Sequence, residues 1–217
     1  MTTETNAPLT IDIVSDVVCP WCYVGKKRLE AALRELPEQK VAIFWRPFQL
    51  DPTIPKEGIP RRTYLERKFG GPEKIAQLHA PLIEIGKAEG IPFAFDKITR
   101  SPNTLDAHRL IRWAHEAGRQ SEMVSRLFAL YFTEGGDIGN KEVLLKAATE
   151  AGLDGALVAQ LLATEADLDP VIAEINGAAK MGISGVPTFI FASRFAISGA
   201  HPAETLKKAI QQSLTAR

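Results

Sequence analysis

Two cysteines three positions apart, Cys19 and Cys22, constrain this chain more than any other feature. They stand between an alternating apolar segment at residues 9–14, which indicates a strand, and a helical pattern that ends before Pro37. Residues 41–45 indicate a second strand, which we expect to be buried on both faces. The chain therefore opens with a strand–helix–strand unit that has its cysteines at the start of the helix.

The middle of the chain is helical in pattern and poor in strand signals. Pro81 should kink or split the first of these helices because proline removes a backbone donor. Asn140 and Asp154 are expected to cap two others through their side chains. The helix that contains Pro81 covers roughly residues 73–89, and the remaining predicted helices cover roughly residues 103–118, 124–131 and 170–181.

The end of the chain returns to strand patterns. Residues 188–192 and 195–198 indicate a hairpin joined by Ser193 and Arg194, and residues 204–214 indicate a closing amphipathic helix. These strands are too few for two independent sheets, so we expect both ends of the chain to share one sheet. The predicted fold class is α/β, with a sheet interrupted by an inserted all-helical domain.

The overall charge gives no sign of a charged partner. The chain has 26 acidic and 26 basic residues, which argues against nucleic acid and membrane as partners. Residues 1–8 lack the pattern of a secretory signal, and no apolar run reaches the ~20 residues of a membrane span. We therefore expect a cytoplasmic protein. A purely structural disulfide does not persist in that compartment, which favours a functional role for the cysteines.

The position of the cysteines suits disulfide exchange. Cys19 precedes the first helical turn, where unpaired N–H groups and the helix dipole favour a thiolate, and Cys22 lies one turn further, within disulfide reach. Pro20 fits that turn because it needs no N–H there, and Trp21 adds apolar surface beside the sulfurs. Two alternatives are a chance pair of buried cysteines and a zinc site. No metal is expected, because there is no third cysteine and the histidines at 79, 108, 115 and 201 lack metal-binding spacing.

A second motif precedes the strand at residues 188–192. Val186 and Pro187 stand in a Gly-Val-Pro-Thr segment, which resembles the cis-proline loop of the thioredoxin superfamily. In that superfamily the loop faces the cysteine motif and presents backbone groups to the substrate disulfide. We therefore predict a cis bond between Val186 and Pro187, opposite the cysteines.

Together, the motifs resemble the DsbA-like thioredoxin proteins and, within them, the cytoplasmic FrnE-type group. This resemblance implies a thioredoxin-like domain of residues 1–60 and 171–217, interrupted by a helical domain of residues 61–170 that covers one side of the cleft. It also implies that Cys19 is the nucleophile and Cys22 the resolving thiol. The resemblance is carried by residues 15–23 (SDVVCPWCY), 45–48 (WRPF), 101–104 (SPNT), 107–110 (AHRL), 137–139 (DIG), 182–189 (GISGVPTF) and 198–200 (SGA).

The sequence departs from this pattern in two ways. Many thioredoxin-like enzymes hold a buried carboxylate six residues before the first cysteine, where this chain has Ile13. Asp16 is the nearest acid, and it is either a proton acceptor or a residue that stabilises a turn. Some FrnE-type members also carry a C-terminal cysteine pair, which this chain lacks.

Three residues are candidates for substrate binding. Asn103 resembles a position that lines the cleft in relatives that bind glutathione, but an asparagine before a helix is equally suited to capping. His108 lies on a helical face that could overlook the cleft, although a buried, hydrogen-bonded histidine is the plainer interpretation. Phe48, which follows the second strand, is the third candidate for substrate binding. Trp113 and Met181 are expected to pack in the interior.

The function that we predict is thiol–disulfide exchange on a disulfide-containing protein or small molecule. No permanently bound cofactor is implied, glutathione is a candidate reductant or co-substrate, and a homodimer is compatible with the resemblance. The first alternative is a glutathione-dependent isomerase or transferase of the 2-hydroxychromene-2-carboxylate isomerase and kappa type. Those relatives usually have serine at the position of Cys19. The second alternative is a non-catalytic binding module, which would need neither cysteine.

Overall fold

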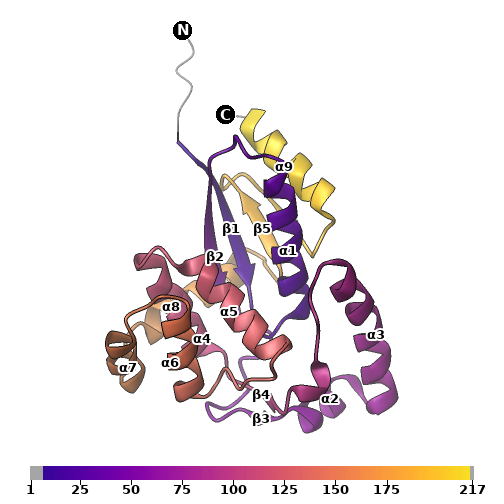
Figure 1. Cartoon of the computed structure of the whole chain (residues 1–217), viewed down its shortest axis with the longest axis vertical. Helices are drawn as coiled ribbons and strands as arrows, with labels where there is room; N and C mark the ends of the chain where they lie inside the picture. The colour runs from indigo at the N-terminus through magenta and orange to yellow at the C-terminus, as the bar shows by residue number, and fades with distance from the viewer. Residues whose placement is uncertain (1–6, 216–217) are drawn as a thin grey trace.

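Figure 1 shows the computed structural model of the chain, which describes residues 7–215. A four-stranded sheet has the order β2-β1-β5-β6. β1 pairs in parallel with β2, β1 pairs in antiparallel with β5, and β5 forms an antiparallel hairpin with β6. The two ends of the chain therefore share one sheet, as predicted. The strands are β1 (Leu9–Ser15), β2 (Val41–Pro47), β5 (Thr188–Phe191) and β6 (Phe195–Ser198).

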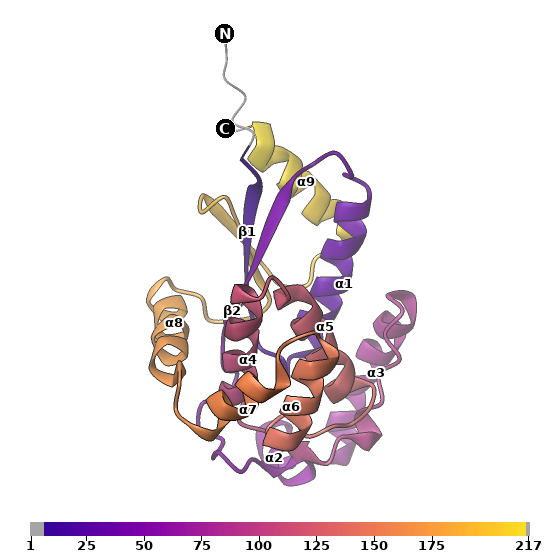
Figure 2. The ribbon, with the colours of Figure 1, turned by 60° about the vertical axis from the view of Figure 1, so that its left-hand side comes forward.

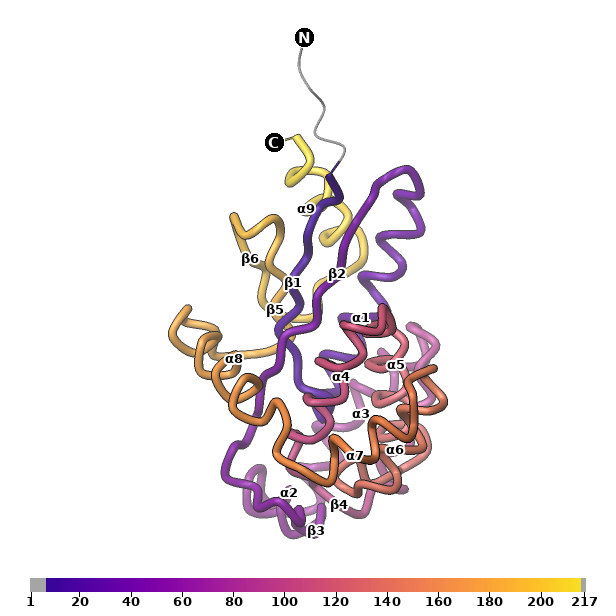
Figure 3. The backbone as a smooth tube through the Cα atoms, turned by 90° about the vertical axis from the view of Figure 1, so that its left-hand side faces the viewer, coloured from indigo at the N-terminus to yellow at the C-terminus, as the bar shows by residue number. Residues whose placement is uncertain are grey.

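Helices cover both faces of this sheet. α1 (Pro20–Arg34) and α9 (Ala203–Thr215) pack against each other on one face. α8 (Leu168–Lys180) contacts β2 and lies on the opposite side of the strands, as Figures 2 and 3 show. This arrangement confirms the predicted α/β fold class.

The segment between β2 and β5 is mainly helical, as predicted. Its helices gather below the sheet in Figure 1. A sheet of two short strands, β3 (Ile59–Pro60) and β4 (Arg100–Ser101), was not predicted. The division into domains stays a prediction, and its boundary at residues 170–171 falls inside α8. The other elements are α2 (Arg61–Phe69), α3 (Pro72–Ala88), the 3-10 helix η1 (Phe95–Lys97), α4 (Leu105–Glu116), α5 (Gln120–Phe132), α6 (Lys141–Glu150) and α7 (Gly155–Ala163).

The predicted helix caps are confirmed. The side chain of Asn140 accepts hydrogen bonds from the backbone N–H groups of Glu142 and Val143 at the start of α6. The side chain of Asp154 does the same at the start of α7. These bonds satisfy N–H groups that have no partner inside the helix.

α3 is not split at Pro81 but continues through it as one helix, and Leu82 and Gly86 on the following turn are buried. Two other local predictions are wrong for tertiary reasons. β2 is half-buried over most of its length, because it lies at the edge of the sheet and the helices cover only the end near Trp45. Met181 is 68% exposed because it follows the last turn of α8.

The hairpin between β5 and β6 turns one residue earlier than predicted. Ala192 and Ser193 both have positive φ angles, 50° and 55°, and Arg194 donates its N–H to the carbonyl of Phe191. Positive φ at two successive residues matches the twist of a tight hairpin. The turn therefore centres on Ala192 and Ser193 and not on Ser193 and Arg194.

Aromatic rings join the sheet to the helices below it. Tyr23 of α1 stacks on Phe128 of α5, with 5.0 Å between ring centroids, and Phe93 meets Tyr23 edge-on at 6.1 Å. Trp45 of β2 meets Phe128 edge-on at 6.4 Å. The core is therefore continuous from the strand–helix–strand unit into the helical segment. No helix in residues 7–215 has the length and apolar character needed to cross a membrane.

Candidate active site

The two cysteines lie at the N-terminus of α1. Cys19 is the cap residue, Pro20 is the first helical residue, and no side chain caps the helix. The first turn carries no acidic residue that would compete with a thiolate for the helix dipole. Cys22 donates its backbone N–H to the carbonyl of Cys19 at 3.1 Å. The positive end of the α1 dipole is therefore free to interact with the Cys19 sulfur.

The loop before β5 faces Cys19. The bond between Val186 and Pro187 is cis, as predicted, and the Cys19 thiol donates to the carbonyl oxygen of Val186 at 3.7 Å. The loop also packs closely on α1, since a Cβ at Gly25 would lie 2.9 Å from Cγ of Pro187. Residues of both motifs therefore meet, although 167 positions separate Cys19 from Val186.

Cys22 lies behind Cys19 and away from solvent. Both thiols are free and buried, with Cys19 4% and Cys22 1% exposed. Burial raises the pKa of the Cys22 thiol well above its usual range, and the neighbouring Cys19 sulfur adds to this rise. The nearby polar groups of the Ser15 side chain and the Asp16 backbone lower the pKa of Cys22 in part. Cys22 is therefore a protected thiol that holds its proton at neutral pH.

Asp16 stabilises the turn before α1, and one of its two carboxylate oxygens forms no hydrogen bond. Its backbone carbonyl accepts the N–H of Cys19, and its Oδ2 accepts the N–H of Leu50 at 2.8 Å. Its Oδ1 is buried and has no hydrogen-bond partner, with Nε2 of His108 3.5 Å away. Asp16 therefore serves the turn, and the geometry leaves its Oδ1 open to a proton.

The three weaker candidate residues do not line the cavity that contains Cys19. The Nε2 of His108 lies 2.8 Å from the backbone oxygen of Phe48, which links α4 to the end of β2. The side chain of Asn103 accepts the N–H of Leu105 and donates to the carbonyl of Ile54. All three residues thus hold the loop after β2 against α4.

A cavity of about 510 Å³ opens beside Cys19. Trp21 and Val186 border it on the side of the cysteines, and α2 and α3 form another wall. This agrees with the prediction that the helical segment covers one side of the cleft. Sequence reasoning missed most of that wall, because its members come from distant segments and form no motif. The polar residues that α2 and α3 contribute to this wall are Arg61, Tyr64, Lys68, Gln77 and His79, and Ser101 of β4 and Tyr131 of α5 also line the cavity.

A dithiol at a helix N-terminus, with a cis-proline loop against it, suits disulfide exchange in which one thiol attacks and the second resolves. Within residues 7–215, no group of three or more His, Cys, Asp or Glu side chains is arranged to hold a metal ion. The fold and this pair of thiols define a protein of the thioredoxin class.

Comparison with known proteins makes the class more specific. Residues 10–211 match the DSBA-like thioredoxin domain, and the chain belongs to that family. It is 30% identical over 201 residues to the uncharacterized protein YwbO of Bacillus subtilis, which covers 92% of this chain and 94% of YwbO. The crystal structure of a probable DsbA oxidoreductase, SCO1869 from Streptomyces coelicolor, is 35% identical. The match covers 96% of this chain and 91% of that one, with a TM-score of 0.86.

Two more distant structures share the fold alone. The cytosolic disulfide reductase DsbM of Pseudomonas aeruginosa, solved with GSH, is 20% identical with a TM-score of 0.66, covering 95% of this chain and 100% of that one. A 2-hydroxychromene-2-carboxylate isomerase is 17% identical with a TM-score of 0.71, covering 94% and 95%. The family supports enzymatic activity of the oxidoreductase kind, and the fold is equally compatible with an isomerase.

Proposed function

We propose that this chain is a thiol–disulfide oxidoreductase in which Cys19 is the nucleophile and Cys22 the resolving thiol. The observation that carries this proposal is the different surroundings of the two sulfurs. Cys19 lines the cavity, whereas Cys22 is absent from its walls and lies behind Cys19. A substrate that enters the cavity therefore meets Cys19 first.

The reaction has two exchange steps. The Cys19 thiolate attacks a substrate disulfide, a mixed disulfide forms, and the first substrate thiolate leaves and takes a proton. Cys22 then loses its proton and attacks the Cys19 sulfur, which releases the second substrate thiolate. The substrate gains two electrons, and Cys19 and Cys22 become a disulfide. The buried Oδ1 of Asp16 is our candidate acceptor for the Cys22 proton, because it has no hydrogen-bond partner and Asp16 lies close enough to Cys22 for its backbone to lower the pKa of that thiol.

The direction that we propose is reduction or isomerisation in the cytoplasm, with glutathione as the recycling thiol. DsbM, described as a cytosolic disulfide reductase and solved with GSH, supports this by its shared fold. Neither Pro20 nor Trp21 offers a charged group to stabilise the Cys19 thiolate, so we expect a reduction potential of about −180 to −240 mV. Equilibration with glutathione buffers measures it, and a value near ~−120 mV would identify an oxidant.

Substitution of each cysteine tests the division of roles. Cys22→Ser should accumulate a mixed disulfide at Cys19 when mixed with insulin, because nothing resolves it. Cys19→Ser should form no adduct and reduce no insulin. Mass spectrometry of acid-quenched samples measures both results, with thermal unfolding as the control for folding.

The same variants test the alternatives. A glutathione-dependent isomerase would keep its turnover in Cys22→Ser, since its chemistry needs one thiol site and not two. A binding module would retain its ligand in both variants and form no adduct in either. Equal residual insulin reduction in the two variants would contradict the proposed roles.

A further inference from the structure

Arg61 places an unpaired positive charge in the wall of the cavity. It is the first residue of α2, and its Nη1 donates to the hydroxyl of Tyr131 at 2.8 Å. Its guanidinium carbon lies 5.7 Å from the centre of the Tyr131 ring. Its Nε is buried and has no hydrogen-bond partner. Within residues 7–215, no carboxylate lies within ion-pair distance of Arg61.

Within residues 7–215, Lys68 also lacks a carboxylate at ion-pair distance, but it is exposed, whereas the carboxylates of the cavity accept hydrogen bonds from nearby groups. Asp51 accepts hydrogen bonds from the N–H and the hydroxyl of Thr53, and Lys68 donates to the hydroxyl of Tyr64. Asp16 accepts the N–H of Leu50 through its Oδ2, and its free Oδ1 lies toward His108. The positive charge of Arg61 therefore faces the cavity without a direct counter-ion.

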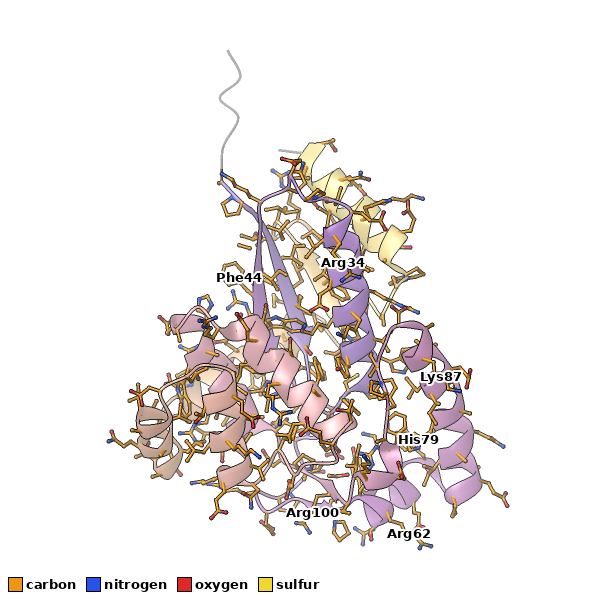
Figure 4. The ribbon with its side chains drawn as sticks, in the orientation of Figure 1. Arg34, Phe44, Arg62, His79, Lys87 and Arg100 are labelled. Carbon is orange, nitrogen blue, oxygen red and sulfur yellow. The ribbon has the colours of Figure 1, made fainter. Side chains whose placement is uncertain are left out.

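His79 does not add a second cation beside Arg61. It lies on the side of α3 that faces the rest of the molecule (Figure 4), and its ring stacks on Phe95 at 4.2 Å between centroids. Burial lowers the pKa of His79, and the charge of Arg61 lowers it further. At neutral pH the imidazole is therefore uncharged, and Arg61 stands beside aromatic and apolar groups.

The surroundings of Arg61 suit a small organic anion. The surface of the cavity is mostly apolar, and a volume of about 510 Å³ matches the range of small-molecule sites, roughly 300–1,000 Å³. Arg61 is half-buried, and its buried Nε lacks a hydrogen bond, which is costly, so a carboxylate that reaches Nε would supply that bond. The apolar residues of this surface include Leu65, Phe69, Ile75, Leu78, Leu82 and Phe95.

We propose that Arg61 is a specificity-determining residue that binds a carboxylate of a small disulfide while Cys19 attacks its sulfur. This inference rests on the proposed function and names its substrate class, a low-molecular-weight disulfide that carries a carboxylate. The exchange is the one described above: the substrate is reduced to two thiols and the cysteine pair is oxidised. A low-molecular-weight thiol reduces the pair again.

Three symmetrical disulfides of similar length test the charge preference. They are 3,3′-dithiodipropionate, which is anionic, bis(2-hydroxyethyl) disulfide, which is neutral, and cystamine, which is cationic. Each is mixed with the pre-reduced protein, and acid quenching followed by mass spectrometry gives the second-order rate constant of a single turnover. We expect the native protein to react fastest with the anion and slowest with the cation.

Arg61→Gln should lower the rate with the anion by about tenfold, the value of one charge-assisted hydrogen bond, and leave the rate with the neutral disulfide within about twofold. Arg61→Lys should keep part of the preference. Arg62→Gln is the matched control, because Arg62, which Figure 4 shows at the periphery of the molecule, is 83% exposed and pairs with Glu66 one turn along α2. The neutral disulfide also reports whether each variant is folded.

Two results would overturn the proposal. One is a native protein that shows no preference for the anion. The other is an equal loss with all three disulfides in Arg61→Gln, which would mean that Arg61 acts on Cys19 or on the fold. A third result would do the same: if Arg61→Gln slowed insulin reduction as much as it slowed the reaction with 3,3′-dithiodipropionate, the subsite would serve acidic polypeptides and not small molecules.

A binding measurement separates this inference from the proposed function. Calorimetric titration of Cys19→Ser protein with 3,3′-dithiodipropionate reports binding without exchange. Binding that disappears in the Cys19→Ser, Arg61→Gln double variant supports the subsite, even if the native protein exchanges none of the disulfides. Exchange by the native protein with binding that is indifferent to Arg61 would support the function and refute the subsite.

Discussion

At the scale of single residues, Cys22 links the chemistry of the site to the stability of the fold. The unfolded chain releases a cysteine proton near pH ~8.5, whereas burial raises the pKa of Cys22 in the folded protein. Below that pH both states are protonated and the full stability is present. Above it the unfolded state gains by losing its proton, so the free energy of unfolding falls by up to ~1.4 kcal/mol per pH unit.

Urea unfolding of the reduced protein between pH 7.5 and 9.5 measures this slope, with Cys22→Ala as the comparison. The substitution lowers stability at every pH by removing a buried side chain, so only the slopes are compared. We expect the slope of Cys22→Ala to be flatter than that of the native protein. Parallel slopes would mean that Cys22 releases its proton equally in the folded and unfolded states.

Asp16→Asn tests whether Asp16 accepts the proton of Cys22. The amide oxygen can still accept the N–H of Leu50, and the backbone turn to Cys19 is unchanged, but the side chain can no longer take a proton. We expect resolution of the mixed disulfide at neutral pH to slow on the order of 10²-fold, with the first attack by Cys19 unaffected. Quenched-flow analysis of adduct lifetime distinguishes the two steps. Unchanged lifetimes would assign Asp16 to the turn alone.

The sequence identified the reactive centre of the site but not its outer wall. Cys19, Cys22 and Pro187 stand in short contiguous motifs. Such motifs can be recognised in the sequence, and they indicate disulfide exchange. Arg61 and Tyr131 are 70 positions apart, on α2 and α5, and only the folded structure brings them together. No pattern along the chain could indicate a contact of that kind.

At the scale of elements, the contact between α1 and the loop before β5 leaves no room at Gly25. A methyl group there would lie 2.9 Å from Cγ of Pro187 and 3.1 Å from Cζ of Phe189. We expect Gly25→Ala to push the loop away from Cys19, to lower stability by about 1–3 kcal/mol, and to slow insulin reduction severalfold. Unfolding and turnover measured on the same sample check both effects.

A control for this substitution is Gly177→Ala in α8, where an added Cβ meets nothing within 4 Å. Alanine favours the helix interior by up to about 1 kcal/mol over glycine, so this variant should be as stable as the native protein or more so. Its insulin reduction should not change. Equal activity in the two variants would show that the spacing between α1 and the loop is unimportant for exchange.

Prediction of the elements succeeded where their signals are local. Asn140 and Asp154 cap helices through bonds to residues two and three positions away, which a sequence pattern can show. α3 continues through Pro81, and the burial of Leu82 and Gly86 on the following turn is a property of the folded molecule. β3 and β4 are two residues each, too short for any alternation to be visible.

At the scale of the whole molecule, Arg109 joins α4 to the connection between α7 and α8. It is 2% exposed, and its guanidinium donates to the carbonyls of Leu161, Thr164 and Ala166 and to the carboxylate of Asp106. We expect Arg109→Leu to lower the free energy of unfolding by about 3 kcal/mol or more, because buried acceptors lose their donor. Urea unfolding of the reduced protein measures the change.

Arg112 on the same helix provides the matched control. It pairs with Asp167 and Glu174 but is 40% exposed, so Arg112→Leu should cost about 1 kcal/mol or less. Similar losses in both variants would show that burial of Arg109 does not set its contribution.

The pairing of β1 with β5 has a consequence for synthesis of the chain. Ile11 pairs with Phe191, so β5, the second neighbour of β1, leaves the ribosome about 180 residues after β1. At ~5–20 residues per second, this delay is on the order of ten seconds. During that time Cys19 and Cys22 lack the loop that later covers them, and the nascent thiols are open to any oxidant or partner thiol nearby. The newly made protein is therefore more vulnerable to mispaired disulfides than the mature one, and a reducing environment during translation protects it.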